Sequence, residues 1–110
     1  MIMTVESLTK ECGFEVVCMP DSQRDVMGAY IGDLLSWVMG KASSGNVWIT
    51  IMSNINVIAV ATLADVSCVI LAEGVAVDND VISAAMAKGV NVLSSKLSAY
   101  EIAKQLSGVV

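Results

Sequence analysis

Two glycines and two aspartates in the first third of the chain are the residues best placed to do chemistry. Gly28 interrupts a short apolar run and Gly32 ends it, while Asp25 precedes the run and Asp33 follows it. A Leu-Leu-x-x-Val pattern with helical spacing begins at residue 34, which predicts a strand that turns sharply into a helix. In α/β proteins such turns carry ligand sites, because a glycine lets a ligand approach the backbone and a helix N-terminus favours an anion.

Three further loops carry polar residues directly after a predicted strand. They contain Met52-Ser53-Asn54, Glu73-Gly74 and Ser94-Ser95. If the strands are parallel, all four loops lie along one edge, where neutral hydrogen-bonding groups and helix dipoles favour a phosphate or carboxylate. We therefore expect the ligand-binding residues among Arg24, Asp25, Gly28, Gly32, Asp33, Thr50, Ser53, Asn54, Asn56, Ser94 and Ser95. The alternative is that helix caps, turns and a surface ion pair or loop brace at Arg24-Asp25 explain the same amino acids.

Several kinds of chemistry are disfavoured by residues that the sequence lacks or places too far apart. There is no histidine, which removes the commonest general base and metal ligand, and we expect no catalytic residue, no metal and no cofactor. A magnesium site or acid–base pair made of Asp25 and Asp33 is disfavoured, because an extended strand separates them by more than about 20 Å. Gly40-Lys41-Ala42-Ser43 fails as a phosphate-binding loop, since Leu35 stands where the motif requires its first glycine.

The charge of the chain argues against two classes of partner. Six basic and eleven acidic residues give a net charge of −5, so we expect neither nucleic acid nor an anionic membrane as a partner. Residues 42–64 carry no charge, but serine, threonine and asparagine interrupt the apolar runs, which predicts a buried strand and helix rather than a membrane span. Because Glu6 and Lys10 break any secretory signal, we expect a cytoplasmic protein.

The apolar content is high for so small a chain. Apolar residues make up 55% of the sequence and aromatic residues 5%, so we expect a homo-oligomer, most simply a dimer, with a different protein partner as the alternative. Trp37 and Trp48 are expected to be core or interface anchors, with a stacking platform for a base as the alternative. Cys12, Cys18 and Cys68 are expected to be free thiols, with Cys68 in the core, although Cys12 and Cys18 could meet across a turn.

The elements that must position these residues follow from hydrophobic periodicity and from cap residues. We expect strands over 14–18, 26–31, 47–51, 67–71 and 90–93, and helices over 5–12, 34–40, 57–63, 79–88 and 99–107. Residues 57–63 suit a strand equally well, but the next strand starts too soon for a parallel pair to be joined otherwise. The alternation predicts an α/β protein, a three-layer α/β/α fold with a mostly parallel central sheet of about five strands, in one domain over residues 1–110.

Some of these residues also resemble a known family. They are Arg24, Asp25, Gly28, the run Gly32-Asp33-Leu34-Leu35-Ser36, and the segments Trp48-Ile49-Thr50 and Asn56-Val57-Ile58-Ala59-Val60-Ala61. From about Val5 to Leu106 the chain resembles the DRTGG domain family, which is similar in fold to the N-terminal domain of HPr kinase/phosphorylase. Asp25-Val26-Met27-Gly28 departs from a literal Asp-Arg-Thr-Gly-Gly, and Asn54 stands where many relatives have a histidine.

The resemblance implies a regulatory or sensing module. DRTGG domains are found beside CBS domain pairs, in phosphotransacetylases and as stand-alone proteins in anaerobic bacteria, and none of these settings gives the domain a reaction of its own. This chain would be the stand-alone form, which binds a small anionic or nucleotide-like ligand or a partner protein. Two alternatives stay open: an adaptor or structural subunit of a larger complex, and a histidine-independent enzyme with Cys18 or Ser53 as its nucleophile.

Overall fold

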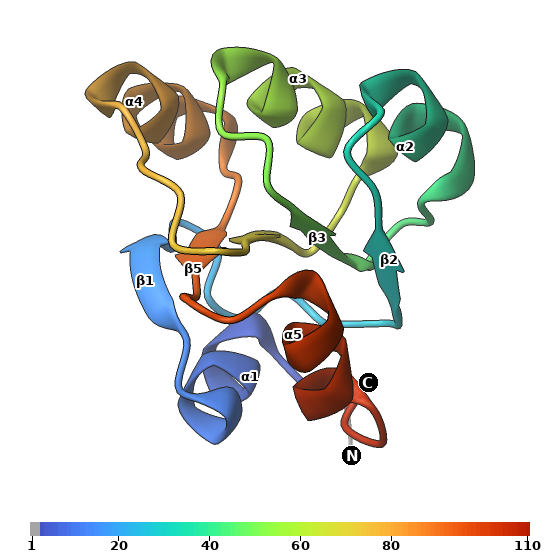
Figure 1. Cartoon of the computed structure of the whole chain (residues 1–110). Helices are drawn as coiled ribbons and strands as arrows, with labels where there is room; N and C mark the ends of the chain where they lie inside the picture. The colour runs from blue at the N-terminus through green and yellow to red at the C-terminus, as the bar shows by residue number, and fades with distance from the viewer. Residues whose placement is uncertain (1–2) are drawn as a thin grey trace.

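The computed structural model describes residues 3–110 as helices that alternate with strands, coloured along the chain in Figure 1. The helices are α1 (Val5–Cys12), α2 (Leu35–Lys41), α3 (Ile55–Ala64), α4 (Asn79–Lys88) and α5 (Ala99–Leu106). The strands are β1 (Glu15–Cys18), β2 (Ala29–Ile31), β3 (Val47–Thr50), β4 (Cys68–Leu71) and β5 (Val92–Ser94). Their order along the chain is the predicted one.

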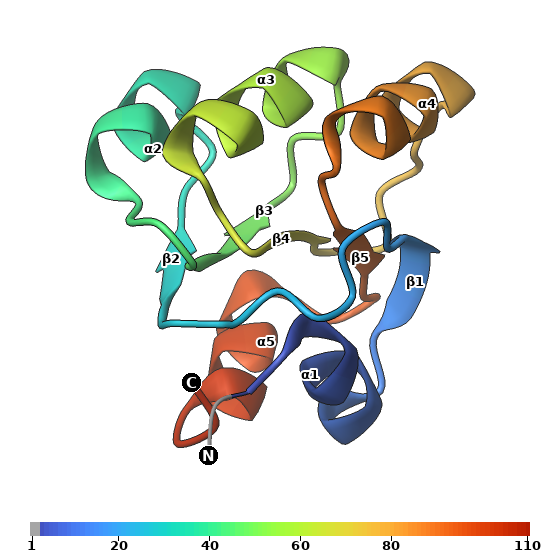
Figure 2. The ribbon, with the colours of Figure 1, turned by 180° about the vertical axis from the view of Figure 1, so that it is seen from behind.

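Within residues 3–110, the strands form a mixed sheet in the order β1-β5-β4-β3-β2. Strands β2 to β5 run parallel, and β1 runs antiparallel to β5 at one border of the sheet. Helices α2, α3 and α4 cover one face and α1 and α5 cover the other, as the opposite views in Figure 1 and Figure 2 show. The predicted three-layer α/β/α fold with a mostly parallel sheet is therefore confirmed.

Each face of the sheet has its own apolar core. Successive residues of a strand point to opposite faces, so Trp48 of β3 packs with residues of α2, α3 and α4, whereas Ile49 packs with residues of α1 and α5. All residues of β3 and β4 are buried. Because both strands are covered on both sides, their sequences are nearly continuous apolar runs instead of alternating ones.

Helix α3 lies at the centre of the three-helix layer and confirms the helix predicted over 57–63. Asn54 caps its N-terminus by accepting a hydrogen bond of 2.9 Å from the Asn56 N–H. Val57 and Ala61 are among its buried residues, which belong to the core on this face. The helix ends at Asp65, which adopts the left-handed conformation with φ of 57°. Aspartate and asparagine tolerate that conformation better than most residues with a side chain.

All five strands differ from their predicted bounds by at least one residue, and β2 and β5 differ most. β2 begins at Ala29 rather than at residue 26, because Gly28 has a left-handed φ of 79° that a regular strand does not contain. β5 begins at Val92 rather than at residue 90, because the Val90 N–H still donates to the Ala85 carbonyl at the end of α4. No helix among residues 3–110 is long and apolar enough to cross a membrane, and residues 42–64 contain β3 and α3, as predicted.

Candidate functional site

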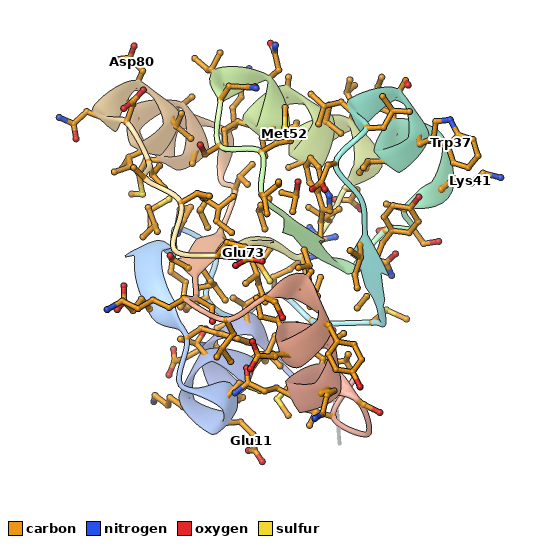
Figure 3. All side chains as sticks on the ribbon, viewed as in Figure 1. Glu11, Trp37, Lys41, Met52, Glu73 and Asp80 are labelled. Carbon is orange, nitrogen blue, oxygen red and sulfur yellow. The ribbon has the colours of Figure 1, made fainter. Side chains whose placement is uncertain are left out.

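The carboxyl edge of the sheet brings the four predicted loops together. Because β2 to β5 are parallel and paired side by side, the segments that follow them lie along the same edge. These segments are residues 32–34, 51–54, 72–78 and 95–98, which lead into α2, α3, α4 and α5. Met52 and Glu73, labelled in Figure 3, belong to two of them. We call these four segments the carboxyl edge.

Asp33 joins two of the four segments. Its Oδ1 atom accepts hydrogen bonds from the Thr50 hydroxyl at 2.8 Å and from the Ile51 N–H at 3.0 Å. The Thr50 oxygen in turn accepts a hydrogen bond of 3.2 Å from the Met52 N–H. Thr50 is buried and Asp33 is exposed. The network therefore ties the end of β2 to the end of β3 and keeps a carboxylate at the surface of the carboxyl edge.

Gly32 serves close packing in this structure. A Cβ atom at this position would lie 2.9 Å from Cε2 of Tyr30 and 3.4 Å from Cγ2 of Val38. The Gly32 carbonyl also accepts a hydrogen bond of 2.8 Å from Nε1 of Trp48, which is fully buried as a core anchor. The space beside Gly32 that was expected to admit a ligand is therefore filled by the Tyr30 ring and by Val38.

The other predicted residues on this edge lie in caps and turns. Asn54 caps α3 as described, and the Ser95 hydroxyl accepts a hydrogen bond of 3.1 Å from the Leu97 N–H. Asn56 is exposed in the first turn of α3, whereas Ser53 and Ser94 are half-buried. Cap and turn roles thus account for Asn54 and Ser95, which lie on the same carboxyl edge after β3 and β5, with β4 between the two strands.

Glu73 adds an unusual backbone conformation to the same edge. Glu73 and Gly74 both adopt left-handed φ values, 62° and 65°. The Glu73 N–H donates to the Leu97 carbonyl and the Gly74 N–H donates to the Ser95 carbonyl, both at 2.9 Å. These bonds hold the loop before α4 against the loop before α5, which compensates for the strained glutamate. The sequence predicted a loop at Glu73-Gly74, but no sequence signal marks a glutamate as left-handed.

Arg24, Asp25 and Gly28 lie at the opposite, amino edge of the sheet, because they precede β2. Nη2 of Arg24 donates to the Asp65 carboxylate at 3.0 Å and to the Asp65 carbonyl at 2.9 Å. Asp25 pairs through its backbone with Thr4, just before α1. Arg24 is therefore a loop brace, and the predicted residues fall into two groups on opposite edges.

Asp65, which sequence reasoning missed, is the centre of this polar cluster. The Ser44 hydroxyl donates to Oδ2 of Asp65, while Arg24 contacts Oδ1. The hydrogen bond from Ser44 and, to a smaller extent, the interaction with Arg24 lower the pKa of the Asp65 carboxyl. The signal that could have identified Asp65 is its position directly after an apolar helical run, where left-handed caps are common.

Gly28 and Asn46 shape the chain where it enters β2. Nδ2 of Asn46 donates to the Met27 carbonyl at 2.7 Å, and its Oδ1 accepts from the Ser43 N–H at 2.9 Å. A Cβ atom on Gly28 would lie 3.2 Å from that amide nitrogen. The positive φ and the close amide together explain the glycine without a ligand.

The cysteine thiols, including the candidate nucleophile Cys18, are not activated. Cys12, Cys18 and Cys68 are free thiols, and Cys68 lies in the core as predicted. Burial raises the pKa of Cys12 and Cys18, and it raises the pKa of Cys68 to about 12. The reactive thiolate form is therefore disfavoured. Residues 3–110 contain no group of three or more histidine, cysteine, aspartate or glutamate residues placed to hold a metal ion.

A cavity of about 270 Å³, lined by none of the predicted residues, lies between the sheet and the C-terminal end of the chain. Its lining includes Ala29, Ile31 and Ile49 from the sheet and Ala103, Leu106 and Val110 from α5 and the residues after it. Its lining carries no charged side chain that could bind a phosphate. Sequence reasoning missed this groove because the two sides come from segments far apart in the chain.

Comparison with solved structures shows several chains of similar fold. The fold is similar to the crystal structure of the CBS and DRTGG domains of the regulatory region of Clostridium perfringens pyrophosphatase, complexed with its activator diadenosine tetraphosphate. The TM-score is 0.70 at 14% sequence identity, and the match covers 90% of this chain and 44% of the other. This chain thus spans less than half the length of that relative, and the likeness shows a shared fold.

Sequence comparison agrees with the structural one. Among curated proteins, none matches this chain. A family model described as the DRTGG domain matches residues 7–109. Since that match covers nearly the whole sequence, the chain belongs to the DRTGG domain family.

Proposed function

We propose that this chain is a non-catalytic regulatory module that binds a small anionic, nucleotide-like ligand at the carboxyl edge. The family of this chain and one structural relative support the proposal. The chain belongs to the DRTGG domain family, and a relative of the same fold is part of the regulatory region of a pyrophosphatase whose activator is a dinucleotide. We propose a ligand of the same chemical class for this chain.

The observation that carries the proposal is the alignment of four strand-to-helix segments along one edge. Helices α3 and α5 begin there, each with a side-chain cap, Asn54 and Ser98. Helix N-termini favour negative charge, and Thr50, Ser53 and Ser95 on or beside the same edge are neutral hydrogen-bonding residues. The helix N-termini and the neutral hydrogen-bonding groups suit a phosphate group, whereas Asp33 keeps one carboxylate at the same surface.

The described side chains favour binding over catalysis. The sequence has no histidine, and the Asp33 carboxylate is already engaged by Thr50 and by a backbone N–H. Burial of the Cys18 thiol and its raised pKa disfavour it as a nucleophile. A regulatory module requires no activated nucleophile, so these features are compatible with the proposed function.

We further propose that the module acts in the cytoplasm as a homo-oligomer and that residues 1–110 form a single domain. Several large apolar side chains are exposed, among them Met27, Leu34, Trp37 and Leu63. Exposed apolar surface favours association with another chain. The same feature favours the second candidate function, an adaptor that docks on a larger complex, and the oligomeric state separates the two.

Thermal unfolding with candidate ligands tests the binding proposal. Suitable probes are diadenosine tetraphosphate, ATP and inorganic pyrophosphate, each titrated into the purified chain. A ligand present at 100 times its Kd adds about 2.7 kcal/mol to the free energy of unfolding. For a chain of this size, that corresponds to a rise in Tm on the order of 10 °C. We expect at least one nucleotide to produce such a rise.

A pair of serine variants locates the binding site in the same experiment. Ser53→Asp places a negative charge on the carboxyl edge and is expected to weaken nucleotide binding by about tenfold through repulsion of the phosphates. Ser43→Asp places the same charge on the amino edge and serves as the matched control, with binding unchanged. Equal losses in both variants would contradict a site on the carboxyl edge. No rise in Tm with any probe would contradict ligand binding and leave the adaptor function.

A further inference from the structure

The two outer strands of the sheet, β1 and β2, differ in how well they are protected against pairing with a further strand. β1 carries a charge at Glu15, its register with β5 is irregular between Val16 and Cys18, and Pro20 follows shortly after it. Such features discourage a further strand from pairing with an edge. β2 at the other border reads Ala-Tyr-Ile, with no charge, no proline and a regular register with β3. β2 is short, with three residues, but it is the outer strand that carries no charge, no proline and no irregular register.

The outward backbone groups of β2 belong to Ala29 and Ile31. The Gly28 carbonyl accepts a hydrogen bond of 3.0 Å from β3, and the Gly32 N–H donates one of 3.2 Å to β3. In a parallel ladder, alternate residues bond to the same neighbour, so Gly28, Tyr30 and Gly32 face β3. The N–H and carbonyl groups of Ala29 and Ile31 therefore point away from the sheet, on the side where no strand formed by residues 3–110 pairs with β2.

We infer that β2 pairs antiparallel with β2 of a second copy of this chain, which joins the two sheets into one. A two-fold axis through Tyr30 places Ala29 opposite Ile31 of the second copy. Those two residues then exchange both N–H to carbonyl bonds, as a hydrogen-bonded pair does in an antiparallel ladder. This register pairs every outward group of both strands. The inference rests on the proposed self-association and names the surface responsible.

Apolar side chains around β2 supply area beyond the backbone bonds. Met27, Ile31, Leu34 and Trp37 come from β2 and from the segments on either side of it, and each exposes between 48% and 66% of its surface. Trp37 points outward from α2 on the β2 side of the molecule, as Figure 3 shows. A fully buried aromatic side chain contributes about 150–250 Å², of which Trp37 offers its exposed 60%, so the four side chains supply part of the roughly 800 Å² per partner that a stable dimer buries.

The apolar groove extends the same surface on the α5 side of the sheet. Ala29 and Ile31 line both the groove and the open border. A paired second copy brings its own Ala29 and Ile31 next to the groove, so the two grooves become continuous beneath the joined strands. The groove is apolar except for Ser107, and two-fold pairing would bury identical apolar residues of the two copies against each other.

Sedimentation velocity over a range of concentrations tests this inference with two matched variants. Ile31→Lys places a charge on the open border, and we expect it to raise the dimer Kd by about 100-fold or more. Val16→Lys places the same charge on an exposed valine of β1 at the other border, and we expect the dimer to persist. Both positions are about half exposed, so both variants should fold, and circular dichroism checks this.

Hydrogen exchange on the unmodified chain provides a second readout that identifies strand pairing itself. The amides of Ala29 and Ile31 should be protected at high protein concentration and exchange rapidly after dilution below the dimer Kd. The Tyr30 amide faces β3 and should stay protected throughout, as an internal control. A concentration-independent exchange of Ala29 and Ile31 would overturn the inference.

The outcomes separate this inference from the proposed function. A wild-type dimer that survives Ile31→Lys would overturn pairing through β2 and leave self-association intact. A wild-type chain that stays monomeric at high concentration would overturn both the pairing and the proposed homo-oligomer. Neither result bears on the proposal that the chain binds a nucleotide, because thermal unfolding with nucleotides tests that proposal separately.

Discussion

Gly32 and Asp33 act together at the end of β2 to hold two strands in place. Gly32 lets the Tyr30 ring approach the backbone, and its carbonyl bonds to the indole of Trp48. Asp33 bonds to the Thr50 hydroxyl and to a backbone N–H beyond it. Both residues belong to the short signature through which the chain resembles its family. Part of that signature therefore serves the fold, and it places an exposed carboxylate on the carboxyl edge.

Replacing Gly32 by alanine should destabilise the chain. The added Cβ would lie 2.9 Å from the Tyr30 ring, so the half-buried ring must move and the core beneath it must repack. Overpacking of this kind costs about 1–3 kcal/mol, which corresponds to a fall in Tm of several degrees. Thermal unfolding followed by circular dichroism measures it.

Gly40→Ala is the matched control for that substitution. Gly40 lies within α2, and a Cβ atom there would meet nothing within 4 Å. Replacing a helical glycine by alanine should raise stability by about 0.5–1 kcal/mol. A Gly32→Ala chain as stable as the Gly40→Ala chain would contradict the packing role assigned to Gly32.

At the scale of elements, the connections at the amino edge are held by polar side chains that reach across loops. Arg24 and Ser44 both bond to Asp65, which ends α3. Asn91, just before β5, is buried and donates to the carbonyls of Asp21 at 2.8 Å and of Ser67 at 3.0 Å. These contacts fasten the incoming ends of the strands, so the amino edge is a structural edge.

Asp65→Asn should weaken the chain in a pH-dependent way. Asparagine tolerates the left-handed conformation, so the substitution mainly removes the charge paired with Arg24. The pair is partly exposed and therefore contributes at most about 1 kcal/mol at neutral pH. Because the folded-state pKa of Asp65 is lowered, its contribution is present above the unfolded pKa of about 3.9 and is lost as the pH falls through the folded pKa.

Denaturant unfolding between pH 7 and pH 2 measures this effect as the difference between wild type and Asp65→Asn. The difference should shrink toward zero at the acid end. In a Ser44→Ala background it should be smaller at neutral pH, because the Ser44 hydroxyl contributes most to the lowered pKa. A difference that stays constant with pH would show that the Asp65 charge does not stabilise the fold.

The order of the elements was predictable from local sequence signals. The contacts between segments far apart in the sequence were not predictable in this way. Ser98 and Glu101 form the capping box that their spacing indicates, and Thr4 caps α1 by accepting a hydrogen bond from a backbone N–H. β2 is shorter than predicted because Gly28 adopts a left-handed conformation, which its position in an apolar run does not reveal. Asp65 was missed because its partner Arg24 lies far away in sequence.

The candidate site was predictable in the same limited way. A parallel sheet puts the four loops along one edge, so Asp33, Thr50, Asn54 and Ser95 were placed correctly from topology alone. Arg24 was predicted as a site residue because it belongs to the residues that resemble the family. Such a resemblance does not reveal on which edge of the sheet a residue lies. The groove beside α5 depends on how two distant surfaces pack, which no local pattern encodes.

At the scale of the whole molecule, the carboxyl edge, the amino edge and the outer strand β2 present three different surfaces. The carboxyl edge has helix N-termini and polar loops, the amino edge is fastened by Arg24 and its partners, and the β2 border is apolar and unpaired. The segment 32–34 belongs to the carboxyl edge and directly follows β2. A ligand on that edge and a second copy on β2 would therefore both contact this segment, which is a direct route for a ligand to influence association.

The most direct test is an NMR titration of the labelled chain with diadenosine tetraphosphate, in which every backbone amide reports its own environment. We predict that the largest shifts fall within residues 32–34, 51–54, 72–78 and 95–98, and that amides around Arg24 and Asp65 on the amino edge stay unchanged. Shifts concentrated on the amino edge, or no shifts with this or any other nucleotide at millimolar concentration, would contradict ligand binding at the carboxyl edge.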